Sequence, residues 1–381
     1  MTETKNILVF IDWYLPGYKA GGPIQSIANL VGKLPHHFWI VTSLFDHNSS
    51  TPYEEIEEAT WTSRRSNEHV MYFGAGGPSS KALKSILKEQ VYDAIYINSL
   101  FSTTYAIKPL WAGKKLGLTN KIVIAPRGML KSGALSVKSK KKVAFLRGAK
   151  TIGLYSGITW HATNKVEEQE ILSTFGKKTK IKIAPNLPRT LEKRYHTPFK
   201  KAGDMKLITV ARVSSEKNIL GGIQFLSTLK TGHIEWAIYG TLQDQIYLEK
   251  CLKAADKIKM LTLHFKGEIH PTGIPEALQQ HHFFYLPTLG ENYGHAIAEA
   301  FLSSVPVIIS NKTPWQQLEK KKAGWSLSLE KEPFNKVLED CLNMDHESYL
   351  TWVEGAKTLG MEITDDHSTI RANENLFENH E

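Results

Sequence analysis

The sequence has no long hydrophobic run. Its 381 residues contain no stretch of about eighteen apolar residues, so no membrane-spanning helix is expected. The chain begins MTETKNILVFIDWY, with one early lysine and a short apolar run that is shorter than the core of a signal peptide. These absences predict a cytoplasmic protein, with peripheral attachment to the inner face of the cytoplasmic membrane left open.

Cysteine is scarce as well. The 2 cysteines, Cys251 and Cys341, form neither a metal-ligand spacing nor a redox motif. This scarcity fits a reducing compartment, in which disulfides are rare. The sequence therefore indicates no cysteine-based metal or redox centre.

The amino-acid composition is ordinary, but the net charge is strongly positive. Hydrophobic residues make up 41% and charged residues 22%, as in a globular protein, and the length predicts two domains. The net charge of +9 favours anionic partners: nucleic acid, phosphorylated metabolites or an anionic membrane surface. Nucleic-acid binding has little support, because no recognised motif accompanies the charge.

Short apolar runs alternate with amphipathic stretches along the chain. This alternation is typical of βαβ units that build a parallel sheet covered by helices on both faces. We expect strands at 7–11, 38–42, 70–73, 94–98, 122–125, 159–162, 181–184, 206–213, 236–239, 261–265, 283–286 and 305–309. Expected helices include 24–34, 80–90, 165–175 and 247–255.

The alternation stops at 185–204, a basic segment that contains prolines and reads as an inter-domain connection. The prediction is an α/β protein with two doubly wound domains, in which ligands bind beyond the carboxyl ends of the strands. The expected parts are an N-terminal domain (1–186), a linker (187–204), a C-terminal domain (205–360) and a C-terminal helix (361–381), whose return to the N-terminal domain is left open.

A glycine pair follows the first expected strand. Gly21 and Gly22 precede an amphipathic helix, so the backbone there can approach a ligand and free amides can meet an anion. Gly17 is too far from Gly21 for a dinucleotide fingerprint, and no phosphate-loop ending follows. A plain turn into a helix is the alternative.

The segment VARVSSEKN places Arg212 and Lys217 around a turn after the expected strand 206–213. An arginine fork and a lysine point charge commonly hold a diphosphate. In the alternative, Ser214 or Ser215 caps the next helix and both cations face solvent.

The segment PTLGENYGHAIAEAFLSS places Glu291 and Glu299 eight positions apart. If both are helical they span roughly 12 Å, which is wider than the roughly 5–9.5 Å of a glycosidase pair. The spacing disfavours a hydrolytic dyad and suits the two ends of a long ligand, with the amides of 292–294 near a phosphate. The alternative is a helix-dipole glutamate plus a surface glutamate.

Taken in order, the motifs resemble retaining glycosyltransferases of family 4, which have the GT-B fold, over nearly the whole chain. The resemblance is carried by the glycine pair, IAPRGMLKSGAL, WHATNKVEEQEI, APNLP, ARVSSEKN, FKGEI, the E-x7-E segment and NKTPWQQLEKKKAGW. The PRGML and TPW elements resemble one bacterial polysaccharide-synthesis branch. The family has two Rossmann-like domains that face a central cleft.

The resemblance implies roles for individual residues. Glu299 would hold the ribose of a nucleotide-sugar donor and Glu291 the donor sugar, while Arg212 and Lys217 would neutralise the diphosphate in place of a metal. The implied catalytic residues are Arg212, Lys217 and Glu291, and the implied donor-binding residues are Gly22, Arg127, Arg212, Lys217, Gly267, Glu291, Asn292, Tyr293, Gly294 and Glu299. No cofactor is implied, because the nucleotide-sugar is a substrate.

The sequence also assigns roles to one arginine and two histidines. Arg127 should face a donor phosphate or the acceptor, with a structural salt bridge as the alternative. His161 is expected to be a hydrogen-bonded structural histidine, and His295 ranks below Glu291 as a sugar contact. The chain departs from the family at Asn98, where a histidine is frequent, and at Ser303-Ser304.

The expected function is sugar transfer from a nucleotide-sugar to a hydroxyl of a glycan or lipid-linked acceptor, in lipopolysaccharide or capsule synthesis. The basic run from Lys131 to Lys150 suits an anionic membrane surface or, equally, a solvated helix face. Alternatives for the whole chain are a GT-B nucleotide-sugar epimerase or phosphorylase, or a non-catalytic polysaccharide-assembly protein.

Overall fold

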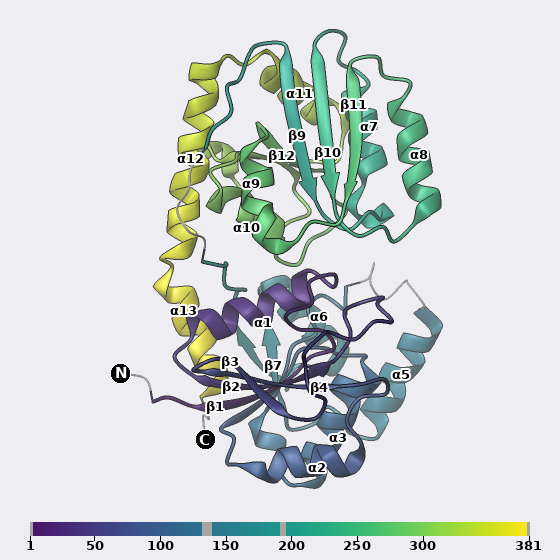
Figure 1. Cartoon of the computed structure of the whole chain (residues 1–381), viewed down its shortest axis with the longest axis vertical. Helices are drawn as coiled ribbons and strands as arrows, with labels where there is room; N and C mark the ends of the chain where they lie inside the picture. Colours follow the sequence, from purple (N-terminus) through teal and green to yellow (C-terminus); the bar gives the residue numbers. More distant parts are fainter. Residues whose placement is uncertain (1–2, 132–138, 191–195, 379–381) are drawn as a thin grey trace. The chain divides into compact units, whose positions relative to one another are not determined.

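The computed structural model describes residues 3–131, 139–190 and 196–378, which form two compact units (Figure 1). Unit 1 consists of the chain up to Leu187 together with the C-terminal segment from His367. Unit 2 consists of Pro188–Asp366. No helix of the described residues is both long and apolar enough to cross a bilayer.

Unit 1 is built on an 8-stranded sheet in the order β3-β4-β2-β1-β5-β6-β7-β8, in which β3 alone of these strands is antiparallel to its neighbour. The strands are β1 (Asn6–Phe10), β2 (His37–Ser43), β3 (Trp61–Arg65), β4 (Glu68–Phe73), β5 (Ala94–Ile97), β6 (Ile122–Ile124), β7 (Thr159–Ala162) and β8 (Lys180–Ile183). The helices are α1 (Gly22–Lys33), α2 (Ser80–Glu89), α3 (Lys108–Lys115), α5 (Ser139–Thr151), α6 (Lys165–Phe175) and α13 (His367–Glu374).

Strand β1 shows why this sheet is covered on both faces. Successive side chains of a strand point to opposite faces, and an all-apolar strand therefore needs a core on each side. Ile7 and Val9 join the cluster that contains Ile24 of α1, whereas Leu8 and Phe10 join the cluster of α2 and α3.

The C-terminal segment completes unit 1. Leu376 and Phe377 are almost fully buried in the same cluster as Ile7 and Val9. The amide of Asn373 donates to the carbonyl of Pro185 at 2.8 Å. Residues far apart in sequence therefore share one core.

Unit 2 has a fully parallel 6-stranded sheet in the order β11-β10-β9-β12-β13-β14. The strands are β9 (Asp204–Val210), β10 (His233–Tyr239), β11 (Leu261–Gly267), β12 (Phe283–Leu286), β13 (Val307–Ser310) and β14 (Gly324–Leu327). The helices are α7 (Ile219–Leu226), α8 (Gln245–Ala255), α9 (Ile274–Gln279), α10 (His295–Leu302), α11 (Lys331–Asn343) and α12 (His346–Thr364). One face packs on α7, α8 and α11, the other packs on α9 and α10, and α12 contributes residues to both clusters.

The predicted fold class is confirmed: both units are α/β, with parallel sheets covered on both faces. Two strands were not predicted, namely the exposed β3 and the short β14. The strand expected at 206–213 ends at Val210, and Val213 instead forms an isolated bridge with Leu242.

Candidate functional site

The strand order of unit 2 reverses between β9 and β12. The chain runs from β9 outward to β11 and then returns to β12 on the other side of β9. In open α/β sheets, ligands bind at the carboxyl ends of the strands at such a reversal. The loops that follow β9 and β12 are therefore the candidate site.

The loop after β9 carries the two predicted cations in different environments. Arg212 lies two positions beyond the strand and is exposed, whereas Lys217 is buried at the end of a short 3-10 helix, Ser215–Lys217. Neither Ser214 nor Ser215 caps the following helix, so that alternative is wrong. The side chain of Asn218 instead donates to the carbonyl of Pro287 at 2.9 Å, which joins this loop to the loop after β12.

Lys217 and Glu291 form an ion pair. The Lys217 Nζ donates to Glu291 Oε1 at 2.6 Å, and the two side chains are only 10% and 15% exposed. A charge-assisted bond of this length is among the stronger hydrogen bonds of a protein. Further bonds join the two loops, because Leu289 N donates to the carbonyl of Glu216 at 2.8 Å. Two predicted site residues from distant parts of the sequence therefore meet.

Glu291 does not lie in a helix. Helix α10 begins at His295, and the residue before it, Gly294, has φ 79°, a left-handed conformation that favours glycine. The separation estimated for two helical glutamates therefore does not apply to Glu291 and Glu299. No side chain caps the N-terminus of α10.

Aromatic packing holds the segment between the two glutamates. The indole Nε1 of Trp315 donates to the carbonyl of Tyr293 at 2.6 Å, and the Tyr293 ring packs against the rings of Trp315 and His295. Burial raises the pKa of the Tyr293 phenol, which therefore stays neutral. Asn292 is half-buried in the same segment.

Glu299 is buried on α10 and pairs with a residue that the sequence analysis did not single out. Arg189 Nη1 lies 3.1 Å from Glu299 Oε1, and the side chains are 21% and 8% exposed. Burial raises the pKa of the Glu299 carboxyl, and the Arg189 guanidinium opposes that rise. The only sequence signal was an arginine in a basic connecting segment.

The same guanidinium brings the turn after β11 to Glu299. Arg189 Nη1 also donates to the carbonyl of Pro271 at 2.9 Å. Gly267 ends β11 with φ 73°, and no atom lies within 4 Å of the position of an added Cβ. Backbone conformation, not crowding, therefore favours glycine at Gly267.

In unit 1 the strand order reverses between β1 and β5, and the loops after these strands carry the other predicted residues. Gly22 is exposed at the start of α1, which no side chain caps. The amide of Asn98, just beyond β5, donates to the carbonyl of Pro23 at 3.4 Å. Asn98 thereby links the glycine loop to Arg127.

Arg127 is half-buried and makes three side-chain hydrogen bonds. Its Nε donates to Asn98 Oδ1 at 2.7 Å, its Nη2 to the Tyr96 hydroxyl at 2.8 Å, and its Nη1 to Asn186 Oδ1. No carboxylate pairs with Arg127 among the residues that the structure describes, so the expected alternative of a salt bridge is wrong.

His161 is structural, as predicted. Its Nδ1 lies 2.6 Å from the Tyr96 hydroxyl and its Nε2 lies 2.7 Å from the carbonyl of Ala184. Burial lowers the pKa of His161 to about 3, so the ring is neutral at physiological pH.

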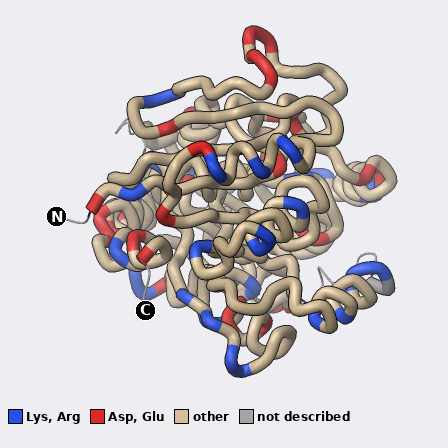
Figure 2. The backbone as a smooth tube through the Cα atoms, turned by 90° about the horizontal axis from the view of Figure 1, so that it is seen from below, with Lys and Arg blue, Asp and Glu red and all other residues tan. Residues whose placement is uncertain are grey.

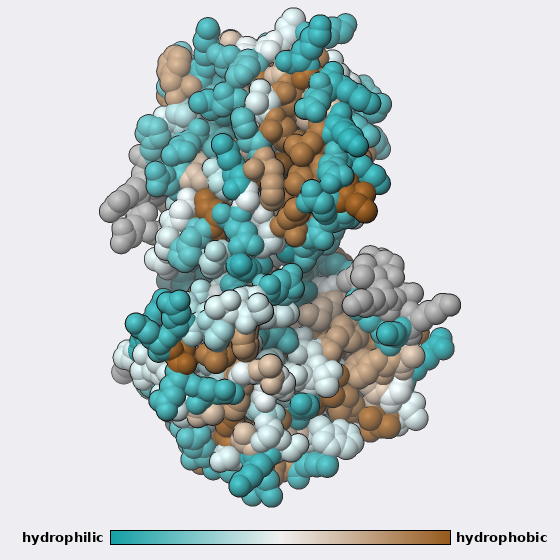
Figure 3. Space-filling model, turned by 45° about the vertical axis from the view of Figure 1, so that its right-hand side comes forward, coloured by the Kyte–Doolittle hydropathy of each residue, from teal (hydrophilic) through white to brown (hydrophobic). Residues whose placement is uncertain are grey.

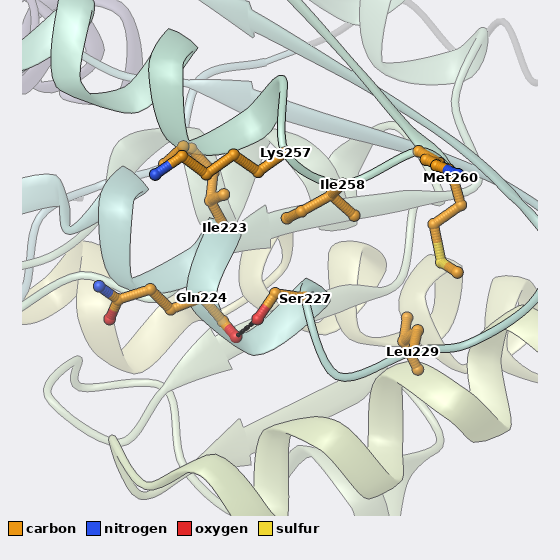
Figure 4. A pocket seen from close by; sticks show the side chains of 9 residues that line it. Ile223, Gln224, Ser227, Leu229, Lys257, Ile258 and Met260 are labelled. Atoms are coloured by element: carbon orange, nitrogen blue, oxygen red, sulfur yellow. Dashed lines mark hydrogen bonds between the residues drawn. The ribbon is translucent and has the colours of Figure 1, made fainter.

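One cavity of unit 2 lies away from these residues. This cavity of about 400 Å³ opens at the amino-terminal edge of the unit 2 sheet, between α7 and the turn that precedes β11 (Figure 4). Gln224 comes from α7, Ser227 is the residue that follows α7, and Lys257 and Met260 come from that turn. It contains none of the predicted site residues. On unit 2, hydrophobic residues also gather in a band between hydrophilic ones (Figure 3).

In the described part of the chain, no group of three or more His, Cys, Asp or Glu side chains is arranged to hold a metal ion. Two cations of the candidate site are paired with carboxylates, Lys217 with Glu291 and Arg189 with Glu299. These pairs offer donors to an anion and acceptors to hydroxyl groups.

Comparisons with known proteins concern unit 2 and the fold. Residues 193–358 match the family "Glycosyl transferases group 1". A comparison with curated proteins found no match.

Solved structures resemble the whole chain. Sucrose-phosphate synthase from Thermosynechococcus elongatus has a TM-score of 0.71 at 13% identity, with 98% of each chain covered. HepE of Anabaena, in complex with UDP and glucose, has a TM-score of 0.67 at 14% identity, with 98% of each chain covered. WaaG, a glycosyltransferase involved in lipopolysaccharide biosynthesis, has a TM-score of 0.64 at 12% identity and the same coverage.

At these identities the likeness shows the fold alone. It agrees with the two parallel-sheet units, which is the GT-B architecture. The protein therefore has the GT-B fold, and its residues 193–358 match the family "Glycosyl transferases group 1".

Proposed function

We propose that this protein is a retaining glycosyltransferase of family 4, which moves a sugar from a nucleotide-sugar to a hydroxyl of a glycan or lipid-linked acceptor in surface polysaccharide synthesis. The observation that carries the proposal is the Lys217–Glu291 pair, at the strand reversal of the unit that matches the Glycosyl transferases group 1 family. The complex of HepE with UDP and glucose supports a nucleotide-sugar donor.

In this proposal Glu299 binds the ribose. Arg189 donates a hydrogen bond to Oε1 of Glu299. The other oxygen, Oε2, accepts from no donor among the described residues and can therefore accept from a hydroxyl of the ligand. The turn from Gly267 to Pro271, which Arg189 holds beside Glu299, packs against the base.

The diphosphate lies between Lys217 and Arg212, near the amides of 292–294. When the bond from the sugar C1 to the diphosphate breaks, negative charge develops on the leaving oxygen, and these cations stabilise it. The acceptor hydroxyl forms the new bond to C1 on the same face, and its proton passes to the departing diphosphate. Glu291 holds hydroxyls of the donor sugar. No metal or cofactor takes part in this proposed scheme.

A thermal-shift panel of UDP-, GDP- and ADP-sugars tests the donor assignment. A ligand that binds only the folded state raises the melting temperature, so one nucleotide class should stabilise the protein. Transfer to a lipid-linked acceptor then separates a transferase from an epimerase, which converts the sugar without an acceptor. Absence of binding to any nucleoside diphosphate would contradict the proposal.

We also propose that the protein works at the inner face of the cytoplasmic membrane. Figure 2 shows how Lys, Arg, Asp and Glu are distributed along the backbone. Helix α5 has no acidic residue, and its Lys141, Arg147 and Lys150 are exposed, as is Val143 at 37%. Part of the predicted basic run, 132–138, lies outside the described residues. Co-sedimentation with phosphatidylglycerol vesicles, but not with phosphatidylcholine vesicles, is expected. Equal sedimentation with both, or with neither, would contradict this proposal.

A further inference from the structure

Arg127 lies in an unfavourable backbone conformation. The amide of Met129 donates to the carbonyl of Pro126 at 3.0 Å, which closes a turn whose central residues are Arg127 and Gly128. Their φ angles are 52° and 76°, and positive φ is uncommon for a residue with a side chain. Such strain persists where the surroundings over-determine it, and it gathers at ligand-binding sites.

A buried carboxylate holds this turn. Glu167, in the first turn of α6, is fully buried, and its Oε1 accepts from Gly128 N at 2.5 Å. Its Oε2 accepts from the backbone N and the hydroxyl of Thr163 at 2.7 and 2.6 Å. Glu167 therefore ties the turn after β6 to the start of α6 and determines where the Arg127 side chain begins.

The far end of Arg127 is held as firmly, through a chain of hydrogen bonds. The carbonyl of Ala184 can only accept, so His161 carries its proton on Nε2 and its Nδ1 accepts from the Tyr96 hydroxyl. The Tyr96 oxygen is then free to accept from Arg127 Nη2. Asn186 and Asn98 supply the other two acceptors.

Every acceptor around this guanidinium is neutral. A guanidinium has five N–H donors, and three of those of Arg127 donate to these acceptors, which leaves two for a ligand. Elsewhere arginines meet carboxylates: Arg64 and Arg65 face Glu68, and Arg189 faces Glu299. Arg127 is thus held at its backbone and at its guanidinium. No carboxylate of the described residues contacts the guanidinium, and the side chain is only half-buried.

We propose that Glu167, Asn186 and Tyr96 are positioning residues that hold Arg127 for a phosphate group of a substrate. A planar, fixed arginine with N–H groups to spare is well suited to phosphate. The inference rests on the proposed function, which offers two sources of this group: the donor diphosphate, or a phosphate on a lipid-linked acceptor.

Calorimetric titration of the full-length protein with UDP and, separately, with farnesyl phosphate in detergent distinguishes the sources. Arg127→Ala should weaken one of these ligands about tenfold, and Glu167→Gln should weaken the same ligand similarly. The double variant should bind it no more weakly than Arg127→Ala, because Glu167 acts through Arg127. Glu168→Gln, on the same turn of α6, is the matched control and should bind like the wild type.

A purely structural Glu167 would lower the melting temperature without this non-additive loss of affinity. Unchanged affinity of Arg127→Ala for both ligands overturns the inference, as do additive losses in the double variant. If Glu167→Gln does not fold, Asn186→Ala takes its place in the cycle, because it removes one acceptor of the guanidinium.

The two proposals fail separately. Wild-type protein that binds no UDP, yet binds farnesyl phosphate through Arg127, contradicts the donor assignment and supports this inference. If the wild-type protein binds UDP and Arg127→Ala changes the affinity for neither ligand, the donor assignment is supported and this inference is contradicted.

Discussion

The two units hold their cations in opposite ways. In unit 2, Lys217 and Arg189 are each paired with a carboxylate, Glu291 and Glu299. In unit 1, Arg127 is surrounded by a hydroxyl and two amide oxygens. When an anion binds a paired cation, it competes with the carboxylate that already contacts the cation. Arg127 contacts no carboxylate of the described residues, so an anion that binds it faces no such competition.

This contrast suggests different roles in a transfer reaction. Charge pairs that rearrange as ligand charge develops can favour a transition state over a bound ground state, which is what catalysis requires. A cation that is fixed and uncompensated binds the ground state and the transition state alike. In the proposed mechanism, we therefore expect unit 2 to contribute most of the rate and unit 1 to contribute affinity and orientation.

The largest expected effect is at Lys217. Lys217→Ala removes a cation from the diphosphate and breaks the ion pair with Glu291, so kcat for transfer should fall about 10²–10³-fold. Steady-state assays measure this, with Lys257→Ala, at the cavity on the other edge of the sheet, as a control of unchanged activity. A kcat within about threefold of the wild type would remove Lys217 from the mechanism.

Glu299 comes next. Glu299→Gln replaces the charged acceptor of the ribose hydroxyls with a neutral one and leaves Arg189 unpaired, so nucleotide affinity should fall about tenfold. Isothermal titration with UDP measures it. Glu276→Gln on neighbouring α9 is an exposed control. Equal affinities of Glu299→Gln and the wild type would place the ribose elsewhere.

Lys200 is a third kind of cation, fully buried with neutral acceptors and out of reach of ligands. Its Nζ donates to the carbonyls of Lys201, Leu342 and Met344, each at 3.0 Å, and burial lowers its pKa to about 8. Between that pH and the ordinary value of 10.5, the unfolded chain holds a proton that the folded chain has released. Folding stability attributable to Lys200 should therefore rise with pH in this window.

Lys200→Met should abolish that rise, which amounts to at most about 1.4 kcal/mol per pH unit. Urea unfolding of both proteins from pH 7.5 to 10 measures the difference, with the exposed Lys201→Met as control. Parallel stability curves for the wild type and Lys200→Met would mean that the buried ammonium keeps its ordinary pKa.

The smallest expected effect is a change in UDP affinity, and its direction should differ between the two units. Glu291→Gln removes the carboxylate that competes for Lys217, so UDP should bind about threefold more tightly even though transfer slows. Asn98→Ala, which removes a neutral acceptor from Arg127, should not tighten UDP binding. Weaker UDP binding by Glu291→Gln would mean that the pair holds Lys217 in place and does not compete for it.

Local sequence pattern predicted the elements whose residues are buried in a sheet. Strands such as β1 and β12 are unbroken apolar runs bounded by polar residues, and both were predicted. Strand β3, with the sequence WTSRR, was missed because only its antiparallel pairing with β4 makes it a strand. Strand β9 was predicted too long because Val213 continues the apolar pattern but pairs in a separate bridge.

The sequence predicted which residues belong to the candidate site, but not which of them pair with one another. Motif spacing singled out Lys217, Glu291 and Glu299, whereas their pairing depends on loops that the fold brings together. Arg189 reaches Glu299 across 110 positions, so no local pattern shows it. Likewise Glu167 stood in a recognised motif, but its bond to Gly128 became visible only in three dimensions. The roles assigned to these residues remain predictions.

The divided make-up of unit 1 has a consequence for how the chain is made. Leu376 and Phe377 complete the core around β1, although β1 is synthesised long before them. During synthesis the first sheet must therefore wait, with part of its apolar surface exposed, until all of unit 2 has emerged. Burial of one such phenylalanine contributes about 1.5–3 kcal/mol. The order of folding should thus differ from the order of synthesis. Hydrogen exchange on a released chain that ends at Asp366 should show an incomplete unit 1 beside a folded unit 2.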